Sequence, residues 1–309
     1  MKVIGLLPFK NEEWILPTYL SNVLPVVDEI IAIDDGSTDN SRKIMEDAGV
    51  KVVGYQINRD LEDLKAGWYE WTMRQELLRL GREAGGTHFV ILDADETFTT
   101  NFLPHARELI ASLKPGQKLA MQWLALWKSY THYRHDHTVW SNNWKDFIIA
   151  DDGTSDYPYT FGGCQRTQGC NEPHTWVRLN TEYGAVLHYQ FSLWNNFQLK
   201  QCNYRMHEFI HLPTGAGLQT NAKHSITLLD DNVGLQEMPE SWTTGIPIPD
   251  YPNFDPSWSE ESYVRPDMLP EAMKHFDDYG VEHFEELDIW HVPQLRDRFI
   301  RDTGRNPRS

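Results

Sequence analysis

The stretch 88-HFVILDADET-97 decides the fold. Phe89 to Leu92 form an apolar run, and Asp93, Asp95 and Glu96 follow it directly. A short apolar run of this kind is typical of a buried strand in a parallel sheet. Unpaired charges are costly to bury, so these carboxylates do not belong inside such a strand. The sequence therefore predicts a buried strand whose acids project from its carboxyl end into a cleft.

Similar apolar runs alternate with helical patterns through roughly the first 120 residues. The expected strands are Lys2–Phe9, Glu29–Asp35, Val50–Tyr55 and Thr87–Asp95, and the expected helices are Asn11–Leu24, Asp39–Gly49 and Leu61–Gly81. Alternation of strand and helix is typical of a mainly parallel sheet with helices on both faces. We therefore predict an α/β, Rossmann-like, doubly wound fold with a mixed, mainly parallel sheet.

Polar residues gather where three of these strands end. They are Pro8–Glu12 after the first strand, Asp34–Ser37 after the second and Asp93–Glu96 after the fourth. Ligands bind outside the carboxyl ends of the strands in such sheets, so we expect these residues to converge on one edge.

Asp93 and Asp95 suit a divalent metal ion at that edge. Neighbouring carboxylates raise one another's pKa unless a cation is shared between them. Mg²⁺ and Mn²⁺ take one or two carboxylates, keep waters and accept phosphate oxygens from a substrate. The sequence therefore predicts Mn²⁺ or Mg²⁺ here, holding a nucleoside diphosphate and stabilising the charge that grows on it as it departs.

The composition narrows the class of partner and the compartment. A net charge of -17 argues against nucleic-acid binding, which needs a basic surface. The first residues are too short an apolar run for a signal peptide, and no segment approaches the roughly 20 apolar residues of a membrane span. Cys164, Cys170 and Cys202 have no zinc spacing and make no complete disulfide framework. We expect free thiols, a reducing compartment and a cytoplasmic protein without a transmembrane segment.

Two long stretches, Leu6–Ser41 and Met73–Glu96, closely resemble the family-2 glycosyltransferases of the GT-A fold. The resemblance covers roughly the first 120 residues, and its three motifs stand in family order. It implies transfer of a sugar from a nucleotide-sugar donor, a UDP- or GDP-sugar, with a metal at the Asp-x-Asp motif, and it favours an inverting reaction.

The resemblance also assigns roles to residues. Donor contacts fall on Pro8, Asn11, Glu12, Asp34, Asp35, Arg74 and Asp93, with Asp34 and Asp35 at base and ribose and Arg74 near the base or diphosphate. Asp93 and Asp95 become metal ligands, supported by Glu96. Taken singly, Asn11 and Glu12 also suit a helix cap, Asp34 a turn and Arg74 a solvated helix position.

The pattern fades beyond about Ala120, where we expect the part that recognises the acceptor. Aromatic residues crowd the segment 122–159, and the exposed minority of them would suit a sugar or glycan, while most should be core. We assign 1–120 to the nucleotide-sugar-binding half, 121–215 to the acceptor side of the same domain, and 216–309 to a C-terminal extension. Its proline-rich part, Met238–Tyr263, reads as an arm that covers the cleft or forms a homo-oligomer contact.

His188 resembles the histidine of a late His-Tyr element in several GT-A families, which implies a further metal ligand, although a structural role also suits a histidine on an apolar strand. A base for the acceptor hydroxyl would come from Asp152, Asp151 or Glu172. We favour Asp152 slightly, because a strand-end carboxylate facing the same cleft is the simplest geometry.

Two other functions compete with transfer. His207-Glu208-x-x-His211 fits the zinc-peptidase pattern, but Pro213 and Gly215 would end the helix at once. The run His132–His137 suits a polar loop better than a metal site. A non-catalytic sugar-nucleotide or glycan binder on the same fold is the second alternative, and the intact pair of Asp93 and Asp95 argues against it.

Overall fold

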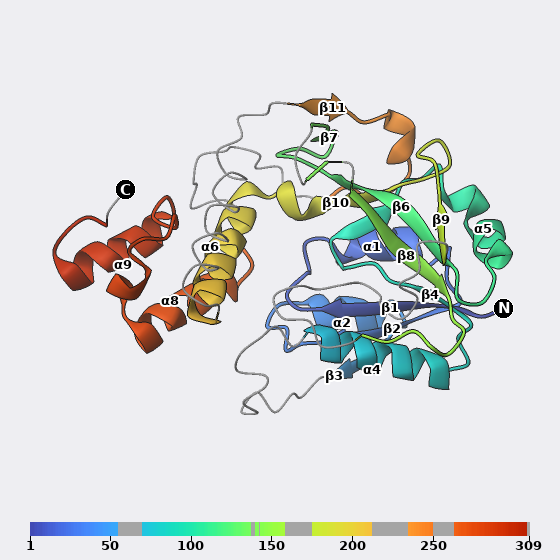
Figure 1. Cartoon of the computed structure of the whole chain (residues 1–309), viewed down its shortest axis with the longest axis horizontal. Coiled ribbons are helices and arrows are strands. Elements are labelled where there is room, and N and C mark those ends of the chain that lie inside the picture. The colour runs from blue at the N-terminus through green and yellow to red at the C-terminus, as the bar shows by residue number, and fades with distance from the viewer. Residues whose placement is uncertain are drawn as a thin grey trace. The chain divides into compact units, whose positions relative to one another are not determined.

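A computed structural model describes residues 1–54, 70–136, 140–141, 143–157, 175–211, 234–249 and 263–307. The chain divides into two compact units. The first comprises Met1–Gln190 and Gly234–Asp250, and the second comprises Phe191–Val233 and Tyr251–Ser309. Each is described by itself, and Figure 1 shows the elements of both.

The first unit is built on a nine-stranded sheet with the order β3-β2-β1-β4-β8-β6-β10-β5, in which β9 also pairs with β6. Its strands are β1 (Val3–Phe9), β2 (Glu29–Asp34), β3 (Lys51–Gly54), β4 (His88–Val90), β5 (Glu96–Phe98), β6 (Lys118–Ala125), β8 (Asn143–Ala150), β9 (Trp176–Arg178) and β10 (Val186–His188). The helices are α1 (Leu16–Val23), α2 (Ser41–Asp47), α4 (Glu70–Glu83) and α5 (Ala106–Ser112). A two-stranded ribbon joins β7 (His132–Arg134) to β11 (Leu235–Glu237).

Strand direction confirms the predicted mixed, mainly parallel sheet. β1, β2, β3 and β4 run parallel to one another. β8 runs antiparallel to both β4 and β6, and β5 runs antiparallel to β10. Because two reversals restore the direction, β6 and β10 run the same way as β4. The carboxyl ends of β1, β2, β4, β6 and β10 therefore lie on one edge of the sheet.

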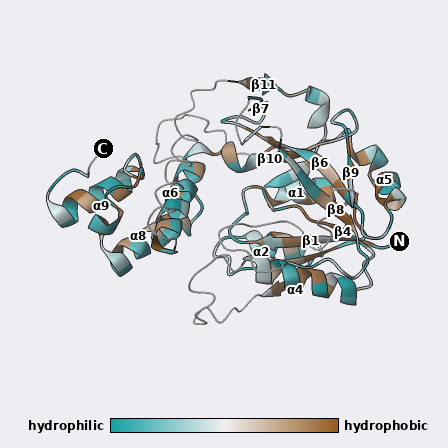
Figure 2. Ribbon diagram, in the orientation of Figure 1, coloured by the Kyte–Doolittle hydropathy of each residue, from teal (hydrophilic) through white to brown (hydrophobic). Residues whose placement is uncertain are grey.

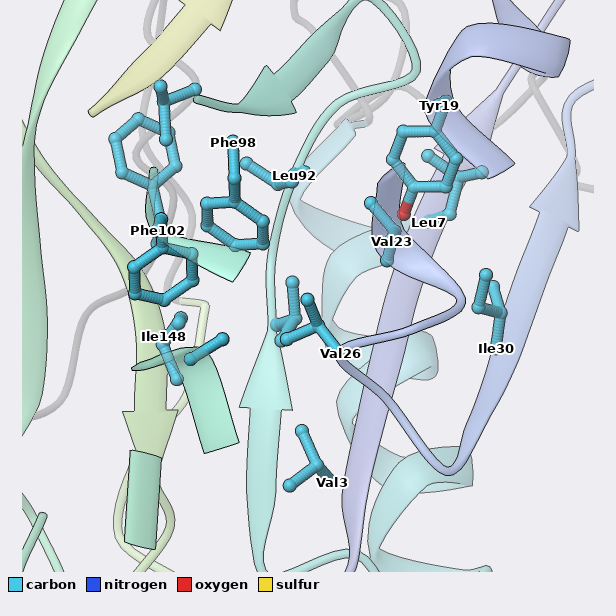
Figure 3. Close-up of a cluster of buried hydrophobic side chains, with 14 of the residues drawn as sticks. Val3, Leu7, Tyr19, Val23, Val26, Ile30, Leu92, Phe98, Phe102 and Ile148 are labelled. Atoms are coloured by element: carbon cyan, nitrogen blue, oxygen red, sulfur yellow. The ribbon is translucent and has the colours of Figure 1, made fainter. Parts of the chain in front are cut away.

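Side chains alternate between the two faces of β1, as expected for a strand buried on both sides. Val3 and Leu7 pack with helices α1, α2 and α5, in the cluster of Figure 3. Ile4 and Leu6 pack with α4 on the opposite face. Figure 2 shows the hydrophobic colour along the central strands. Helices therefore cover both faces of the sheet, as the sequence predicts.

The second unit contains α6 (Trp194–His211), α8 (Met268–Tyr279), a short 3₁₀ turn η5 (Val281–Phe284) and α9 (Pro293–Thr303). Leu199, Cys202 and Met206 of α6 share one apolar cluster with residues of α8 and α9. Gly304 ends α9 in the left-handed conformation, with φ 73°, which glycine adopts without steric cost.

The observed units do not follow the boundary expected at residue 215, whereas the segments on either side of residue 120 share one domain, as expected. β6, β8 and β10 belong to the same sheet as β1–β4, so both predicted halves form one body up to Gln190. Helix α6 joins the C-terminal helices instead, because its apolar face packs with theirs. Residues 234–250 return to the first unit, where Thr18 Oγ1 donates to the carbonyl of Pro247 at 2.7 Å. No helix among the described residues is both long and apolar enough to cross a membrane.

Candidate active site

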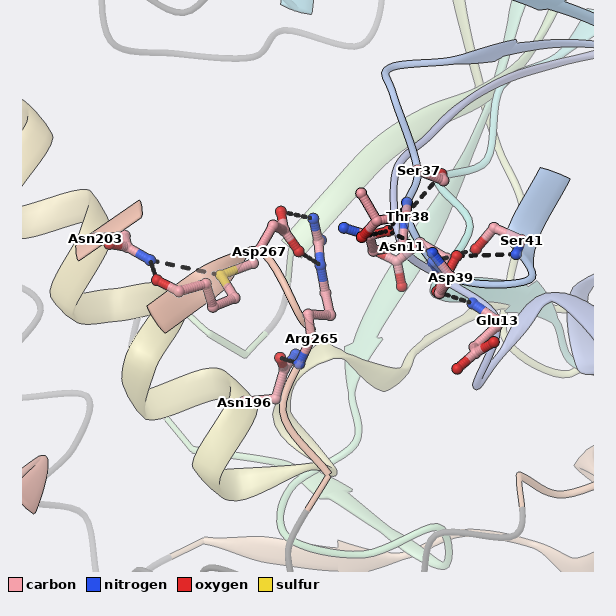
Figure 4. A network of polar contacts seen from close by, with 12 residues as sticks. Asn11, Glu13, Ser37, Thr38, Asp39, Ser41, Asn196, Asn203, Arg265 and Asp267 are labelled. Atoms are coloured by element: carbon pink, nitrogen blue, oxygen red, sulfur yellow. Dashed lines mark hydrogen bonds and ion pairs between the residues drawn. The ribbon is translucent and has the colours of Figure 1, made fainter. Parts of the chain in front are cut away.

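Asn11 ties the loop after β1 to the loop after β2. Its carboxamide oxygen accepts hydrogen bonds from the backbone N–H groups of Thr38 at 2.7 Å and Asp39 at 3.3 Å (Figure 4). Its own N–H donates to Ser37 Oγ at 3.0 Å. The residue is fully buried with φ 53°, a conformation that asparagine tolerates better than most residues. Asn11 thereby fixes the shape of the predicted nucleotide side.

Neither Asn11 nor Glu12 caps the first helix through its side chain. The cap position of α1 is Ile15, and no side-chain hydrogen bond is made there. Glu12 Oε2 instead accepts from Trp14 Nε1 at 2.9 Å, and the backbone N–H of Glu12 donates to Ser41 Oγ. The alternative reading of these residues as helix caps is therefore wrong. Pro8 lies within β1 itself, opposite Ile33 of β2.

One carboxylate oxygen of Asp34 is used in the turn that follows β2. Its Oδ1 accepts from the backbone N–H of Ser37 at 2.8 Å, and Gly36 between them has φ 81°. Arg42 Nη1 lies 3.6 Å from Asp34 Oδ2. Asp35 follows at the strand end, 8% exposed, and its N–H donates to the carbonyl of Phe9. Asp34 thus makes a turn contact and also lies near Arg42, and both acids are at the carboxyl edge.

The acidic turn after β4 has a different partner for each carboxylate. Asp93 Oδ1 accepts from Arg74 Nη2 at 2.6 Å, and Arg74 is only 2% exposed. Asp95 Oδ2 lies 3.4 Å from His188 Nε2. Glu96 is fully buried and accepts from Trp123 Nε1 at 2.7 Å and from the backbone N–H of Asp93 at 2.9 Å. Glu96 therefore braces the turn, as predicted, and Arg74 is a buried ion-pair partner and not a solvated helix residue.

These contacts correct one premise of the sequence argument. A shared divalent ion is not the only cation that offsets the repulsion between the acids, because Arg74 already does so for Asp93. Asp93 stays 30% exposed in this pair. One oxygen of the carboxylate accepts the arginine bond, and a carboxylate has further lone pairs for another partner.

His188 reaches the acidic turn because β10 lies beside β5. His188 pairs in register with Glu96 on β5 and with Ala125 on β6. Its ring stacks on Trp123, with centroids 4.2 Å apart, and Lys145 Nζ lies 3.6 Å from the centre of the same indole. The structure thus brings together the late histidine and the acids nearly 100 residues earlier in the chain. Trp123 and Lys145 are site neighbours that sequence reasoning missed, since nothing in the aromatic-rich segment distinguished Trp123 from other core residues.

Tyr19 of α1 is a second neighbour that the sequence did not reveal. Its side chain is fully buried in the cluster of Figure 3. Burial and the negative charges of Asp93 and Glu96 raise its pKa far above the usual range. Within the described part of the chain its hydroxyl has no hydrogen-bond partner. Tyr19 therefore stays neutral beside the acids.

Asp95 and His188 fit a metal ion by geometry and by chemistry. Two neighbouring ligand atoms on an octahedral ion, each at about 2.1 Å, lie about 3 Å apart, close to the 3.4 Å between Asp95 Oδ2 and His188 Nε2. Carboxylate and imidazole both suit Mn²⁺. No group of three or more ligating side chains is already assembled among the residues described. Substrate phosphate and water would have to complete the shell, which is common for Mg²⁺.

Asp151 and Asp152 lie at the wrong edge of the sheet to serve as the base. β8 runs antiparallel to β4, so its last residue, Ala150, lies opposite His88 at the start of β4. Asp151 forms a two-pronged ion pair with Arg82, at 2.8 and 2.7 Å. Hydrogen bonds from Thr154 lower the pKa of Asp152, which weakens it as a base. The prediction assumed that β8 points into the cleft, and its reversed direction overturns it. Glu172 lies outside the described residues.

The competing metal motifs gain no support. His207 and His211 lie in the last turns of α6 with ring centroids 4.5 Å apart, but no third ligand completes a metal group in the described ranges. His132 belongs to β7, and His137 lies outside the described residues. In the aromatic segment, the residues with at most 8% exposure are Trp123, Trp127, Tyr130, Tyr133, Phe147 and Tyr157. Most of the aromatic residues described in that segment are therefore core, as expected.

The first part of the chain is similar to a known protein family. Residues 6–62 match the family model for glycosyl transferase family 2. No curated protein matches. Among solved structures, glucosyl-3-phosphoglycerate synthase from Mycobacterium tuberculosis, in complex with Mn²⁺ and uridine-diphosphate-glucose, is 21% identical, with a TM-score of 0.28 over 40% of this chain and 44% of that chain. S. aureus TarS is 15% identical, with a TM-score of 0.38 over 73% of this chain and 43% of that chain.

The chain thus spans less than half the length of either structure. The family match covers the segment that carries Pro8, Asn11, Glu12, Asp34 and Asp35. Over residues 6–62 the chain is therefore similar to glycosyl transferase family 2, and its mixed sheet agrees with the predicted α/β fold.

Proposed function

We propose that this protein transfers a sugar from a nucleotide-diphosphate sugar, a UDP- or GDP-sugar, to a sugar or glycan acceptor, with Mn²⁺ or Mg²⁺ bound by Asp93, Asp95 and His188. One observation carries the proposal. The carboxyl ends of β1, β2, β4 and β10 lie on the same sheet edge, and each bears residues suited to a part of that donor. This is the edge at which open α/β sheets bind ligands.

The donor would lie across the strand ends. The loops that Asn11 links are held in place by its hydrogen bonds, so Asp34 and Asp35 are preorganised for the hydroxyl groups and N–H groups of a nucleoside. Pro8 and Glu12 would flank the same nucleoside. Arg74 and Asp93 sit on the diphosphate side, where a buried guanidinium suits phosphate oxygens.

Charge on the leaving diphosphate is the main energetic problem for an acidic protein. A divalent ion, when bound, would supply positive charge at that point. Arg74 supplies a second, fixed positive charge that needs no reorganisation, because Asp93 already holds it in place. Glu96 and Trp123 keep the turn rigid, so that Asp93 and Asp95 retain their geometry as charge develops.

The acceptor side is less specified. A base for the acceptor hydroxyl is still required in an inverting reaction. Asp151 and Asp152 are excluded by strand direction, which leaves Glu172 of the three candidates. We propose that the acceptor side lies around β6 and β10, where Trp123 and Lys145 adjoin His188. This surface would lie next to the reacting sugar.

The proposal is tested by release of nucleoside diphosphate from UDP- and GDP-sugars with Mn²⁺, Mg²⁺ or chelator, with and without a panel of sugar acceptors. We expect metal-dependent release that Asp95→Asn abolishes. Asp47→Asn is the matched control, because Asp47 is exposed on α2 and pairs only with Lys43 among the described contacts. A thermal shift with nucleotide but no turnover would instead favour a non-catalytic binder. No shift with any nucleotide or sugar nucleotide would refute both readings.

A further inference from the structure

The second unit contains a buried thiol among charged side chains that the proposed transfer reaction does not use. Cys202 and Arg205 lie one turn apart on α6, and both are fully buried. Asp288 and His291 come from the segment that links η5 to α9. Two elements distant in sequence therefore bring a thiol, a guanidinium, an imidazole and a carboxylate together.

The distances place the thiol next to the imidazole. Cys202 Sγ lies 3.7 Å from His291 Nε2 and 3.9 Å from the carbonyl oxygen of Ile289. On the other side of the ring, His291 Nδ1 lies 3.8 Å from Asp288 Oδ1. The order is thiol, imidazole, carboxylate, with the carboxylate at ion-pair distance from an imidazole that faces the sulfur atom.

Arg205 adds a positively charged guanidinium group that has few hydrogen-bond acceptors among the described residues. Its Nη1 donates to the carbonyl of Asp288 at 2.6 Å. Its Nη2 is 4.0 Å from Asp288 Oδ2, beyond hydrogen-bond distance, and its Nε and Nη2 have no hydrogen-bond acceptor in the ranges that the structure describes. A buried guanidinium with unused donors is costly unless an anion lies nearby. Cys202 is the group on the same helix that acts on it electrostatically, together with Asp288.

A negative sulfur would balance the charges of the groups described in this cluster. The groups that act on His291 are Cys202, Asp288 and Arg205. Burial by itself would lower the pKa of His291, but Cys202 and Asp288 outweigh it and raise that pKa to about 9. A charged Cys202 is itself one of the causes of that raised pKa, so a positive imidazole and a negative sulfur go together as an ion pair, with the positive Arg205 beside them. Asp288 offsets one of these two positive charges, and a thiolate would offset the other.

We propose that Cys202 is held as a thiolate by His291 and Arg205, and that it is a site of oxidation by small, neutral peroxides. Thiolates, not thiols, are the nucleophiles, and neighbouring cations favour them. The sulfur itself is fully buried, whereas the His291 side chain that faces it is 26% exposed, so the imidazole lies between the sulfur and solvent. Hydrogen peroxide is small enough for such a path, and bulky electrophiles are not.

The reaction balances with the groups present. The thiolate attacks one peroxide oxygen, the O–O bond breaks, and Cys202 becomes a sulfenic acid while the other oxygen leaves as hydroxide. The His291 imidazolium gives its proton to that hydroxide, which forms water. Sulfur is oxidised by two electrons and peroxide is reduced by two. The sulfenic acid and the imidazole are then both neutral, and Asp288 alone offsets the charge of Arg205.

Absorbance at 240 nm tests the thiolate directly, in the full-length chain. Cys164→Ser with Cys170→Ser leaves Cys202 as the single cysteine, and the same chain with Cys202→Ser provides the baseline. We expect the folded protein to show close to one thiolate at pH 7, and the unfolded protein only a few per cent, since a free thiol ionises near pH ~8.5. His291→Gln, at a partly exposed position, should remove most of the signal while leaving the circular dichroism spectrum unchanged.

Mass spectrometry tests the modification. After treatment with hydrogen peroxide and trapping with dimedone, we expect one adduct on Cys202 in the single-cysteine protein, formed at least tenfold more slowly in His291→Gln. N-ethylmaleimide should react with Cys202 slowly until the protein is unfolded. A folded protein without thiolate absorbance at pH 7 would show that Cys202 is a neutral core thiol. A thiolate that gives no adduct would overturn the oxidation step.

Discussion

Replacing Trp123 by phenylalanine isolates the hydrogen bond that braces the acidic turn. The change deletes the Nε1–H donor to Glu96 Oε1, at 2.7 Å, and keeps an aromatic ring next to His188. Glu96 is fully buried, so the oxygen that loses its donor gains no water in exchange. A hydrogen bond to a charged group is worth about 1.5–3 kcal/mol, and we expect a loss of stability of that size.

The assay is urea unfolding of the wild-type and variant proteins, with the melting temperature as a second readout. For a unit of this size, the loss corresponds to a fall of about 3–12 °C. Trp144→Phe is the control, because Trp144 is half-buried on the neighbouring β8 and packs against Arg178 instead of a carboxylate. Metal-dependent nucleotide binding should weaken in Trp123→Phe alone. If the free energy of unfolding falls by the same small amount in both variants and both bind nucleotide equally, the hydrogen bond from Trp123 does not hold Glu96 and the acidic turn in place.

Three further predictions follow from the same contacts. Asp152→Asn and Asp151→Asn should leave the rate of sugar transfer within about twofold of wild type, because both residues lie at the opposite edge of the sheet. Asp151→Asn should in addition lower stability, because it weakens the ion pair with Arg82. A rate loss above about tenfold in either variant would contradict the placement of these residues away from the cleft. His188→Ala should weaken Mn²⁺-dependent nucleotide binding by at least about tenfold, measured by calorimetry, and unchanged affinity would remove it from the metal site. Burial lowers the pKa of His207 and His275 to about 4 in the folded chain, below the usual 6.5. Between pH 6.5 and 4 the unfolded chain therefore binds more protons than the folded chain. The second unit should have its full stability above pH 7 and lose stability as the pH falls through that range. Urea midpoints that do not change from pH 7 to 4.5 would contradict this prediction.

The sequence was a good guide to the sheet and to the acids at its carboxyl edge, for a physical reason. Apolar runs such as Ile30–Ile33 and Phe89–Leu92 have a local pattern that indicates burial, and acids at their ends mark the edge. The direction of β8 is not local information, because Asn143–Ala150 has the same apolar character whichever way it runs in the sheet. That is why Asp151 and Asp152 were misplaced.

Pair contacts were beyond prediction for a related reason. Arg74 and Asp93 meet through the packing of α4, and His188 meets Asp95 through the register of β10. Neither depends on spacing along the chain. The resemblance to known transferases supplied Arg74 and His188 as candidates, but not the partners that the structure gives them. The assignment of α6 to the second unit likewise depends on which apolar face its residues share, not on its own periodicity.

The return of residues 234–250 to the first unit has a consequence for biosynthesis and for dissection of the protein. The polypeptide passes from one unit to the other three times, after Gln190, after Val233 and after Asp250. A single proteolytic cut therefore never releases an intact unit. A stop codon before residue 234 would delete the C-terminal helices, and it would also remove β11 and the contact of Pro247 with Thr18. On the ribosome, the ribbon of β7 and β11 cannot form until most of the chain has been synthesised, so the two units are expected to mature together and not in succession.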